Sequence, residues 1–116
     1  MPPRHGGLAP HRLRKVLLYI EDHVAETVVV RQLADAAFMS PFHFAHEFKR
    51  AVGKPPHAYM TMLRMEHAKK LLATTDIALA EVAASVGYQT QSHFTGLFHR
   101  YVGVTPRAYR LNARIA

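Results

Sequence analysis

Apolar residues recur every three or four positions in several separate stretches of the chain, which is the spacing of amphipathic helices. The first stretch, with Leu13, Val16, Ile20 and Val24 on one side, predicts a helix over 11–25. Similar patterns predict helices over 31–37, 41–52, 57–73, 79–86 and 91–101, and a short last helix from residue 106. No segment alternates as a half-buried strand does. The pattern therefore predicts an all-α fold with seven helices.

Residues that start and stop helices refine this picture. Ser40 before Pro41 suits an N-cap followed by proline in the first turn, and Gly53 suits the end of the same helix. Residues 1–10 contain Pro, Gly and Arg without periodicity, and 113–116 follow the last pattern. We expect a flexible basic tail over 1–10, either without a role or tracking DNA, and a short tail over 113–116.

The second half of the chain repeats the first at a shift of about 50 residues. The matches are Arg50 with Arg100, Gly53 with Gly103, Pro56 with Pro106, Tyr59 with Tyr109, His43-Phe44 with His93-Phe94, and Phe48 with Phe98. Further back the shift is 49, so that Ala34 matches Ala83. Such repetition indicates one supersecondary unit used twice. Each unit reads as a helix, a tight turn, a second helix and a Gly-x-x-Pro exit.

The two turns differ in the residue that must bend the chain. Gly87 can take the left-handed conformation that a helix-turn-helix needs, whereas Phe38 holds the corresponding place in the first unit. A bulky residue with positive φ costs about 1 kcal/mol or more, so we expect the first turn to be shaped differently. Val29 stands where a capping Ser or Thr would favour the helix that follows.

Charge narrows the choice of partner. The chain has 15 Lys and Arg against 8 Asp and Glu, a net charge of +7 and a pI near 10.2. This balance favours nucleic acid, or less often an acidic membrane surface. The absence of Cys excludes disulfides and thiolate metal sites. No apolar run is long enough for a signal peptide or a membrane span, and we expect a cytoplasmic protein.

Nine His residues raise the question of a metal site, but neither a carboxylate nor a cysteine pattern completes a ligand set. His43 and His93 recur at equivalent places, which favours a structural or phosphate-facing role. The chain also lacks a nucleophile elbow, a phosphate loop and paired carboxylates. We expect no metal, no cofactor and no enzymatic activity.

The second helix of the later unit carries the clearest candidate chemistry. If Phe94, Leu97 and Phe98 face the core, the outward positions are Gln91, Ser92, Thr95 and Gly96. Gln pairs with adenine through two hydrogen bonds, and Ser and Thr can form hydrogen bonds with several different bases. An ordinary polar helix surface remains the alternative for this segment alone.

Residues 87–110 resemble the signature of the AraC/XylS family of bacterial transcription regulators. The shared features are Gly87, Ser92-His93-Phe94, Phe98, Gly103, Thr105-Pro106 and Tyr109-Arg110 in register. The likeness extends back through Met39 to Phe44, Phe48-Lys49-Arg50, Gly53, Tyr59, Arg64, Ala68 and Leu71-Leu72, and covers 11–112.

This resemblance implies an AraC-type DNA-binding domain with two homeodomain-like lobes. The helix-turn-helix lobes would span 11–55 and 76–112, joined by a linker helix over 56–75. The two recognition helices would enter successive major-groove segments. A linker helix of roughly 25 Å plus its flanks suits one duplex turn of about 34 Å. A monomer would then read an asymmetric promoter site, with activation favoured over repression, RNA polymerase as a further candidate partner, and a nucleoid-associated location.

The resemblance also assigns site residues. The base-reading positions are Pro41, Phe42, Ala45, His46, Gln91, Ser92, Thr95 and Gly96. The phosphate-contacting candidates are Ser40, Lys49, Arg50, Arg64, Thr90, His93, Arg100, Arg107 and Arg110, and the turn residues are Phe38 and Gly87. His46 and Gly96 stand where the family often has Arg. Because Gly96 has no side chain that could donate to guanine, we expect the second lobe to read DNA more weakly or with more tolerance of A·T pairs.

Two other classes of function remain open. A small helical adaptor could dock on RNA polymerase through exposed Met60, Met62 and Phe42, with only non-specific DNA affinity. A basic amphipathic membrane binder is disfavoured by the globular, doubly capped organisation. The chain is either a stand-alone regulator or the DNA-binding part of a longer protein.

Overall fold

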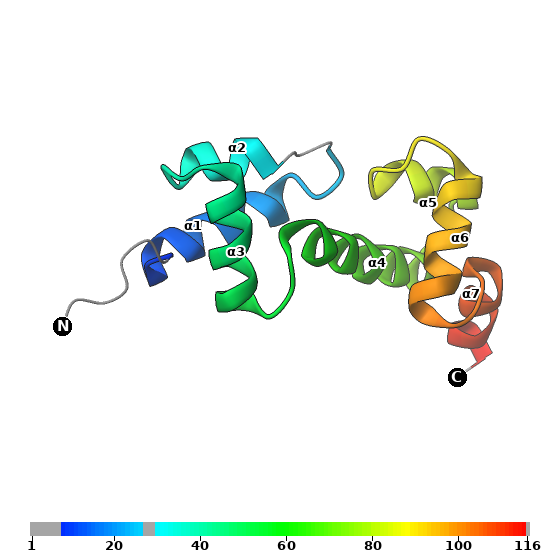
Figure 1. The fold of residues 1–116 in the computed structure, drawn as a ribbon. Helices are drawn as coiled ribbons and strands as arrows, with labels where there is room; N and C mark the ends of the chain where they lie inside the picture. Colours follow the sequence, from blue (N-terminus) through cyan, green and yellow to red (C-terminus); the bar gives the residue numbers. More distant parts are fainter. Residues whose placement is uncertain (1–7, 27–29, 116) are drawn as a thin grey trace. The chain divides into compact units, whose positions relative to one another are not determined.

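A computed structural model describes residues 8–26 and 30–115, and these residues form seven helices and no strand (Figure 1). The helices are α1 (Pro10–Asp22), α2 (Val30–Ala36), α3 (Pro41–Val52), α4 (Pro56–Thr74), α5 (Leu79–Ser85), α6 (Gln91–Val102) and α7 (Pro106–Ile115). The predicted all-α fold with seven helices is confirmed. The chain divides into two compact units, Met1–Thr61 and Met62–Ala116.

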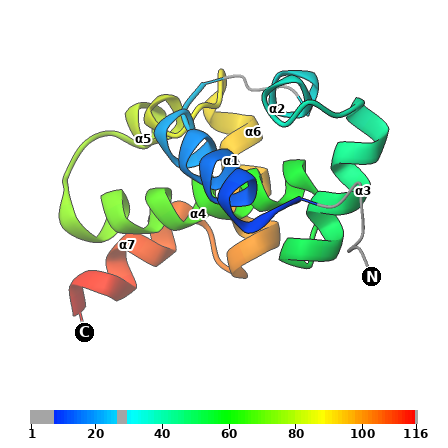
Figure 2. The same cartoon turned by 90° about the vertical axis from the view of Figure 1, so that its left-hand side faces the viewer.

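The first unit contains α1, α2, α3 and the beginning of α4. A tight turn joins α2 to α3 (Figures 1 and 2). Its core is made of side chains that are almost fully buried: Val16, Ile20, Leu33, Ala34, Ala37, Phe44 and Phe48. Burying each large apolar side chain contributes about 1.5–3 kcal/mol, so the amphipathic faces of the three helices hold this unit together.

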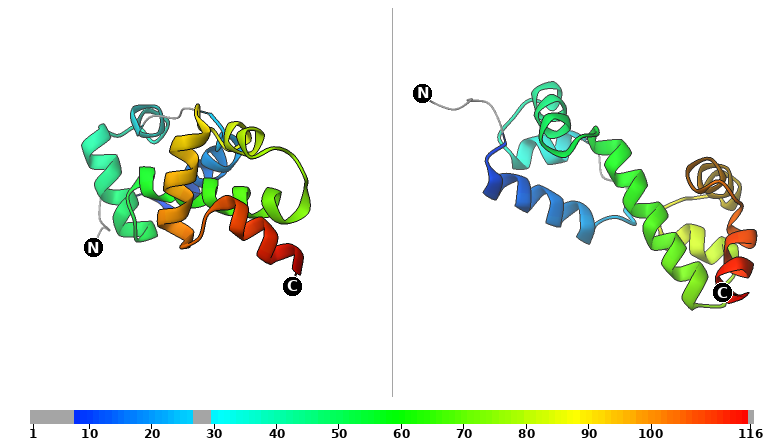
Figure 3. Two further views of the ribbon diagram at one scale, coloured as in Figure 1. Left: turned by 90° about the vertical axis from the view of Figure 1, so that its right-hand side faces the viewer. Right: turned by 90° about the horizontal axis from the view of Figure 1, so that it is seen from below.

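The second unit contains the rest of α4 with α5, α6 and α7. A turn joins α5 to α6, and α7 follows α6 closely (Figure 3). One cluster forms its core, composed of Met65, Ala68, Leu72, Val82, Ala83, Val86, Tyr88, Phe94 and Phe98. Ala83 is fully buried, as expected of a small residue that lets α6 approach α5 closely.

The two units repeat the same arrangement of aromatic rings. The Phe44–Phe48 and Phe94–Phe98 pairs each have centroids 5.7 Å apart. A tyrosine then meets the second ring of each pair edge-on at 5.7 Å, Tyr59 in the first unit and Tyr109 in the second. The internal repeat in the sequence is therefore a repeat of core packing, and each α3 or α6 helix is anchored by equivalent rings.

The turns before α3 and α6 share one backbone conformation despite their different residues. Phe38 has φ 60° and Gly87 has φ 96°, and both values are left-handed. The same backbone hydrogen bond of 2.9 Å closes each turn, from Met39 to Ala34 and from Tyr88 to Ala83. The expectation of a differently shaped first turn is therefore wrong. The packing of α2 against α3 imposes the conformation on Phe38, although phenylalanine disfavours it.

Equivalent capping residues fix the start and end of α3 and α6. The side chain of Ser40 accepts a hydrogen bond from the His43 N–H at 3.2 Å, and Thr90 accepts one from His93 at 3.1 Å. Both helices end on a glycine in the left-handed conformation, Gly53 and Gly103. These caps set where the outward side chains of each helix begin.

The structure corrects the bounds at both ends of the chain. Helix α1 begins at Pro10, which was placed in the tail over 1–10, and ends at Asp22 rather than at 25. Helix α7 runs to Ile115, so residues 113–115 are helical rather than a tail. Residues 1–7 and Val29, for which a tail and a missing cap were expected, lie outside the described residues.

Candidate nucleic-acid interface

The outer side of α6 carries the four residues that the sequence assigned to base reading. Gln91, Ser92, Thr95 and Gly96 together line one shallow hollow. Gln91 and Ser92 are exposed, while Thr95 is half-buried. We call these four residues the α6 face. It offers an amide and two hydroxyl groups within the first turn and a half of a capped helix, which is a hydrogen-bonding surface suited to base edges.

The hollow of the α6 face owes part of its shape to Gly96. A Cβ atom added at this position would meet no atom within 4 Å. The glycine is therefore not required by packing, and space remains there for a longer side chain.

The corresponding α3 face consists of Pro41, Phe42, Ala45 and His46. Phe42 is 85% exposed and His46 is exposed, while Ala45 is half-buried. Three of the four side chains are apolar, so this face can contact thymine methyl groups but makes few hydrogen bonds. The two faces stand at equivalent places on equivalent helices and differ in chemistry at every position.

Three cationic side chains assigned to phosphate contact are exposed, namely Lys49, Arg100 and Arg107. Arg50 is exposed as well, and its Nη1 lies 3.3 Å from a carboxylate oxygen of Glu47. Glu47 is only 8% exposed and also lies 3.9 Å from Nε2 of His43. Leu97 stands at the equivalent position in the second unit. Arg100, the equivalent of Arg50, therefore has no carboxylate at this position to pair with.

Two other arginines assigned to phosphate contact bind within the second unit. The Arg64 guanidinium lies 5.3 Å from the centre of the Tyr88 ring, a cation–π distance. The Arg110 Nε donates to the Leu72 carbonyl at 3.2 Å, and Arg110 is half-buried. These side chains join α4 to the second turn and α7 to α4, so they also support the position of α6.

The remaining phosphate candidates sit at the helix starts. Ser40 and Thr90 are exposed, and their side chains act as the N-caps of α3 and α6. The exposed His93 packs its ring edge-on against Tyr88 with centroids 5.4 Å apart. A helix N-terminus attracts anions because its first N–H groups lack partners. The structure thus places these three residues at the exposed N-terminal ends of α3 and α6.

Arg12 contacts the first turn, which the sequence did not predict. Its Nη1 donates to the Ala37 carbonyl at 3.3 Å, and its guanidinium lies 5.5 Å from the Phe38 ring centre. Phe38 itself is 83% exposed. No sequence signal identifies this contact, because it depends on how α1 packs beside the end of α2.

Other predicted features can be placed as well. Met60 is only 6% exposed, so the adaptor hypothesis was wrong to treat it as a surface residue. Among the described residues, no three His, Asp or Glu side chains gather as a metal site would require. None of the helices in the described part is long and apolar enough to cross a membrane.

Comparison with known proteins decides the family. Residues 33–112 match the family described as a helix-turn-helix domain. The chain is 32% identical over 106 residues to the regulatory protein PocR of Salmonella typhimurium, covering 90% of this chain and 35% of PocR. It is 33% identical to the transcriptional activator RhaS of Escherichia fergusonii, covering 85% of this chain and 36% of RhaS.

A solved structure of a DNA-binding domain also resembles this chain. The DNA-binding domain of the global transcriptional factor AdpA, in complex with a target DNA, matches with a TM-score of 0.85 and 32% identity, covering 90% of this chain and 94% of that domain. The chain belongs to the AraC/XylS family. This is a family of DNA-binding transcription regulators and not of enzymes. The chain spans about a third of the length of the two curated relatives.

Proposed function

We propose that this AraC/XylS-family chain binds double-stranded DNA sequence-specifically, with α3 and α6 as its two recognition helices in successive major-groove segments. The observation that supports this most directly is the α6 face, where Gln91, Ser92, Thr95 and Gly96 line one hollow on an exposed, capped helix. The AdpA domain, which shares this fold, was solved with its target DNA.

The two faces would read different bases. Gln91 can hydrogen-bond to adenine, and the hydroxyl groups of Ser92 and Thr95 can form hydrogen bonds with several different bases. Phe42 and Ala45 can contact thymine methyl groups, and His46 supplies a polar group beside them. Gly96 offers no donor, so the second half of the site would tolerate A·T sequence. Because the faces differ, a monomer would recognise an asymmetric site.

Exposed cations would hold the helices on the duplex. Lys49, Arg50, Arg100 and Arg107 lie on or just after the two recognition helices and would contact phosphates, with Ser40, Thr90 and His93 at the helix starts. Arg64 and Arg110 would act partly by positioning α6. We further propose that the chain activates transcription at a promoter, in line with the name of the RhaS relative, a transcriptional activator. RNA polymerase is a further partner in this proposal.

Replacement of Gln91 tests the base-reading role. On the best duplex selected from a random library, Gln91→Ala should cost about 1–3 kcal/mol of binding free energy, and little on an unrelated duplex. Gln89→Ala is a matched control, since Gln89 is exposed but does not line the hollow. Fluorescence anisotropy titrations on both duplexes provide the ratio of affinities. An equal loss on both duplexes would remove Gln91 from base reading.

A further inference from the structure

A second hollow lies in the first unit, between α1 and α2, and none of its lining residues belongs to α3. Its volume is about 480 Å³, within the usual range of small-molecule sites of roughly 300–1,000 Å³. Val16, Leu33 and Ala36 provide an apolar lining. Val16 and Leu33 are buried core residues, so this wall is part of the folded unit.

Aromatic and cationic side chains complete the hollow. Tyr19 and Phe38 contribute rings, and His11, Arg12 and Lys15 contribute cationic or titratable groups. No Asp or Glu is among the lining residues. A site with an apolar wall, two rings and uncompensated positive charge is complementary to an organic anion with a flat apolar body, since the rings and the aliphatic wall cover the body while the cations meet the charge.

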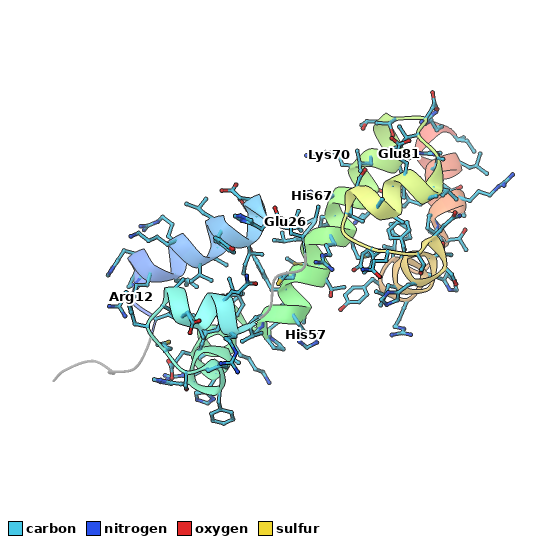
Figure 4. The ribbon with its side chains drawn as sticks, turned by 90° about the horizontal axis from the view of Figure 1, so that it is seen from above. Arg12, Glu26, His57, His67, Lys70 and Glu81 are labelled. Atoms are coloured by element: carbon cyan, nitrogen blue, oxygen red, sulfur yellow. The ribbon has the colours of Figure 1, made fainter. Side chains whose placement is uncertain are left out.

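One of the cations is already held in place. Arg12 lies at the start of α1 beside α2 (Figure 4). Its hydrogen bond of 3.3 Å to the Ala37 carbonyl and its position 5.5 Å from the Phe38 ring centre restrict the guanidinium. Lys15 lies three residues further along α1, on the same side of the helix. An anion would therefore meet a partly pre-organised pair of cations, which lowers the entropy cost of binding.

We propose that the hollow between α1 and α2 binds a small aromatic carboxylate, with the carboxylate between Arg12 and Lys15 and the ring against Tyr19, Phe38 and the apolar wall. This site is separate from the α3 and α6 faces and does not depend on DNA binding. It would make the first unit a ligand-binding element as well as a DNA-binding one.

Titration with 1-naphthoate tests the proposal, with the neutral amide 1-naphthamide as the matched ligand. Isothermal titration calorimetry of the protein without DNA should show saturable binding of one naphthoate, and naphthamide should bind about tenfold more weakly, a difference of about 1.4 kcal/mol. Equal affinities for the two ligands would overturn the assignment of an anion site, and the lack of saturable naphthoate binding would overturn the site itself.

Three variants locate the binding. Lys15→Gln should lower the affinity for naphthoate by about tenfold, and Ala36→Trp should abolish naphthoate binding by filling the hollow. Arg14→Gln should leave it unchanged, because the exposed Arg14 is on the same helix but does not line the hollow. Circular dichroism verifies that each variant is folded. If Ala36→Trp unfolds, Lys15→Gln still tests the site, because it changes only an exposed side chain.

Two results would contradict this location. If Arg14→Gln weakens naphthoate binding as much as Lys15→Gln does, the attraction is a general effect of the net charge of the protein. If Lys15→Gln weakens binding of a random duplex while naphthoate affinity stays unchanged, the cations contact DNA phosphates rather than a small anion.

Discussion

At the scale of single residues, the turns before α3 and α6 show how tertiary packing overrides local preference. Phe38 and Gly87 hold equivalent left-handed conformations, although this costs a non-glycine residue roughly 1–2 kcal/mol. The neighbouring Ala34 and Ala83 are fully buried and let the helices pack closely. The first turn also gains the Arg12 hydrogen bond to the Ala37 carbonyl. Close packing of α2 and α3 therefore imposes the turn even where phenylalanine disfavours it.

Substitutions at the two turn positions should act in opposite directions. Gly87→Val should lower the free energy of unfolding by about 1–2 kcal/mol, because valine must adopt φ near 96°. Phe38→Gly should leave it unchanged or raise it by up to about 1 kcal/mol, because the strain is relieved. Urea unfolding followed by circular dichroism measures both changes.

A helical glycine provides the control for this comparison. Gly96→Ala should stabilise α6 by about 0.5–1 kcal/mol, since the added Cβ meets no atom within 4 Å. A loss above about 1 kcal/mol in Phe38→Gly would contradict the account of strain at the first turn.

At the scale of secondary structure elements, local signals determined how well the sequence predicted each helix. The predicted bounds of α3 agree with the structure because Ser40, Pro41 and Gly53 mark both ends chemically. The end of α1 was misplaced because Val24 continues the apolar pattern and is buried, although it lies beyond the helix. Burial, and not helical geometry, sets the pattern at such positions.

The caps should contribute measurably to the stability of α6. Thr90→Ala removes the acceptor for the His93 N–H and should cost about 1 kcal/mol. Ala78→Ser adds a capping side chain to α5, whose N-cap makes no side-chain hydrogen bond, and should stabilise by about 0.5–1 kcal/mol. Ser92→Ala is the control within α6, since Ser92 is not the cap. Thermal unfolding of the three variants checks this, and a loss in Ser92→Ala equal to that in Thr90→Ala would contradict it.

An ion pair at the end of α7 should make the second unit sensitive to acid. Arg114 Nη1 lies 2.7 Å from Oδ1 of Asp76, and its other nitrogen donates to the Thr75 carbonyl. The hydrogen bond from Arg114, and then its charge, lower the pKa of Asp76 below the usual value. Because the folded-state pKa lies below the unfolded one, the stabilisation is complete above the usual pKa and is lost as pH falls through the lowered value.

A comparison of Tm values at two pH values tests this pair. Asp76→Asn should lower the Tm at pH 6, and the difference from the wild type should shrink as the pH falls through the lowered pKa of Asp76, because its carboxylate is then lost in the folded state as well. Arg114→Gln should have a similar effect at pH 6, and the double variant should lose little more. A difference that persists unchanged at pH 2 would show that Asp76 acts through something other than its charge.

At the scale of the whole molecule, a net charge of +7 and the different chemistry of the α3 and α6 faces favour the proposal that the chain reads DNA at two places. Repetition and outward spacing were visible in the sequence, so the residues of the α6 face could be chosen from helical periodicity alone. The contacts of Arg12, Arg64 and Arg110 could not be predicted from the sequence, because each of them joins elements far apart in the chain. Periodicity tells which side of a helix is buried, but not which neighbour a long side chain reaches.

DNA affinity should depend steeply on salt. If about five phosphates are neutralised, log K against log[salt] should have a slope of about −4 to −5. Arg100→Ala should reduce the magnitude of this slope by about 1, whereas Arg14→Ala, on α1, should not change it. Anisotropy titrations of a fixed duplex across salt concentrations measure the slopes. A slope near zero would contradict binding through phosphate contacts.

Selection on a random duplex library, carried out with the wild-type protein and with Gln91→Ala, tests most directly whether α3 and α6 each read a separate part of the DNA site. We predict that the wild type enriches one asymmetric motif with two separated elements, and that the variant loses preference in only one of them. A motif with a single element, a palindrome, or a loss of preference across both elements in the variant would contradict reading by two independent recognition helices.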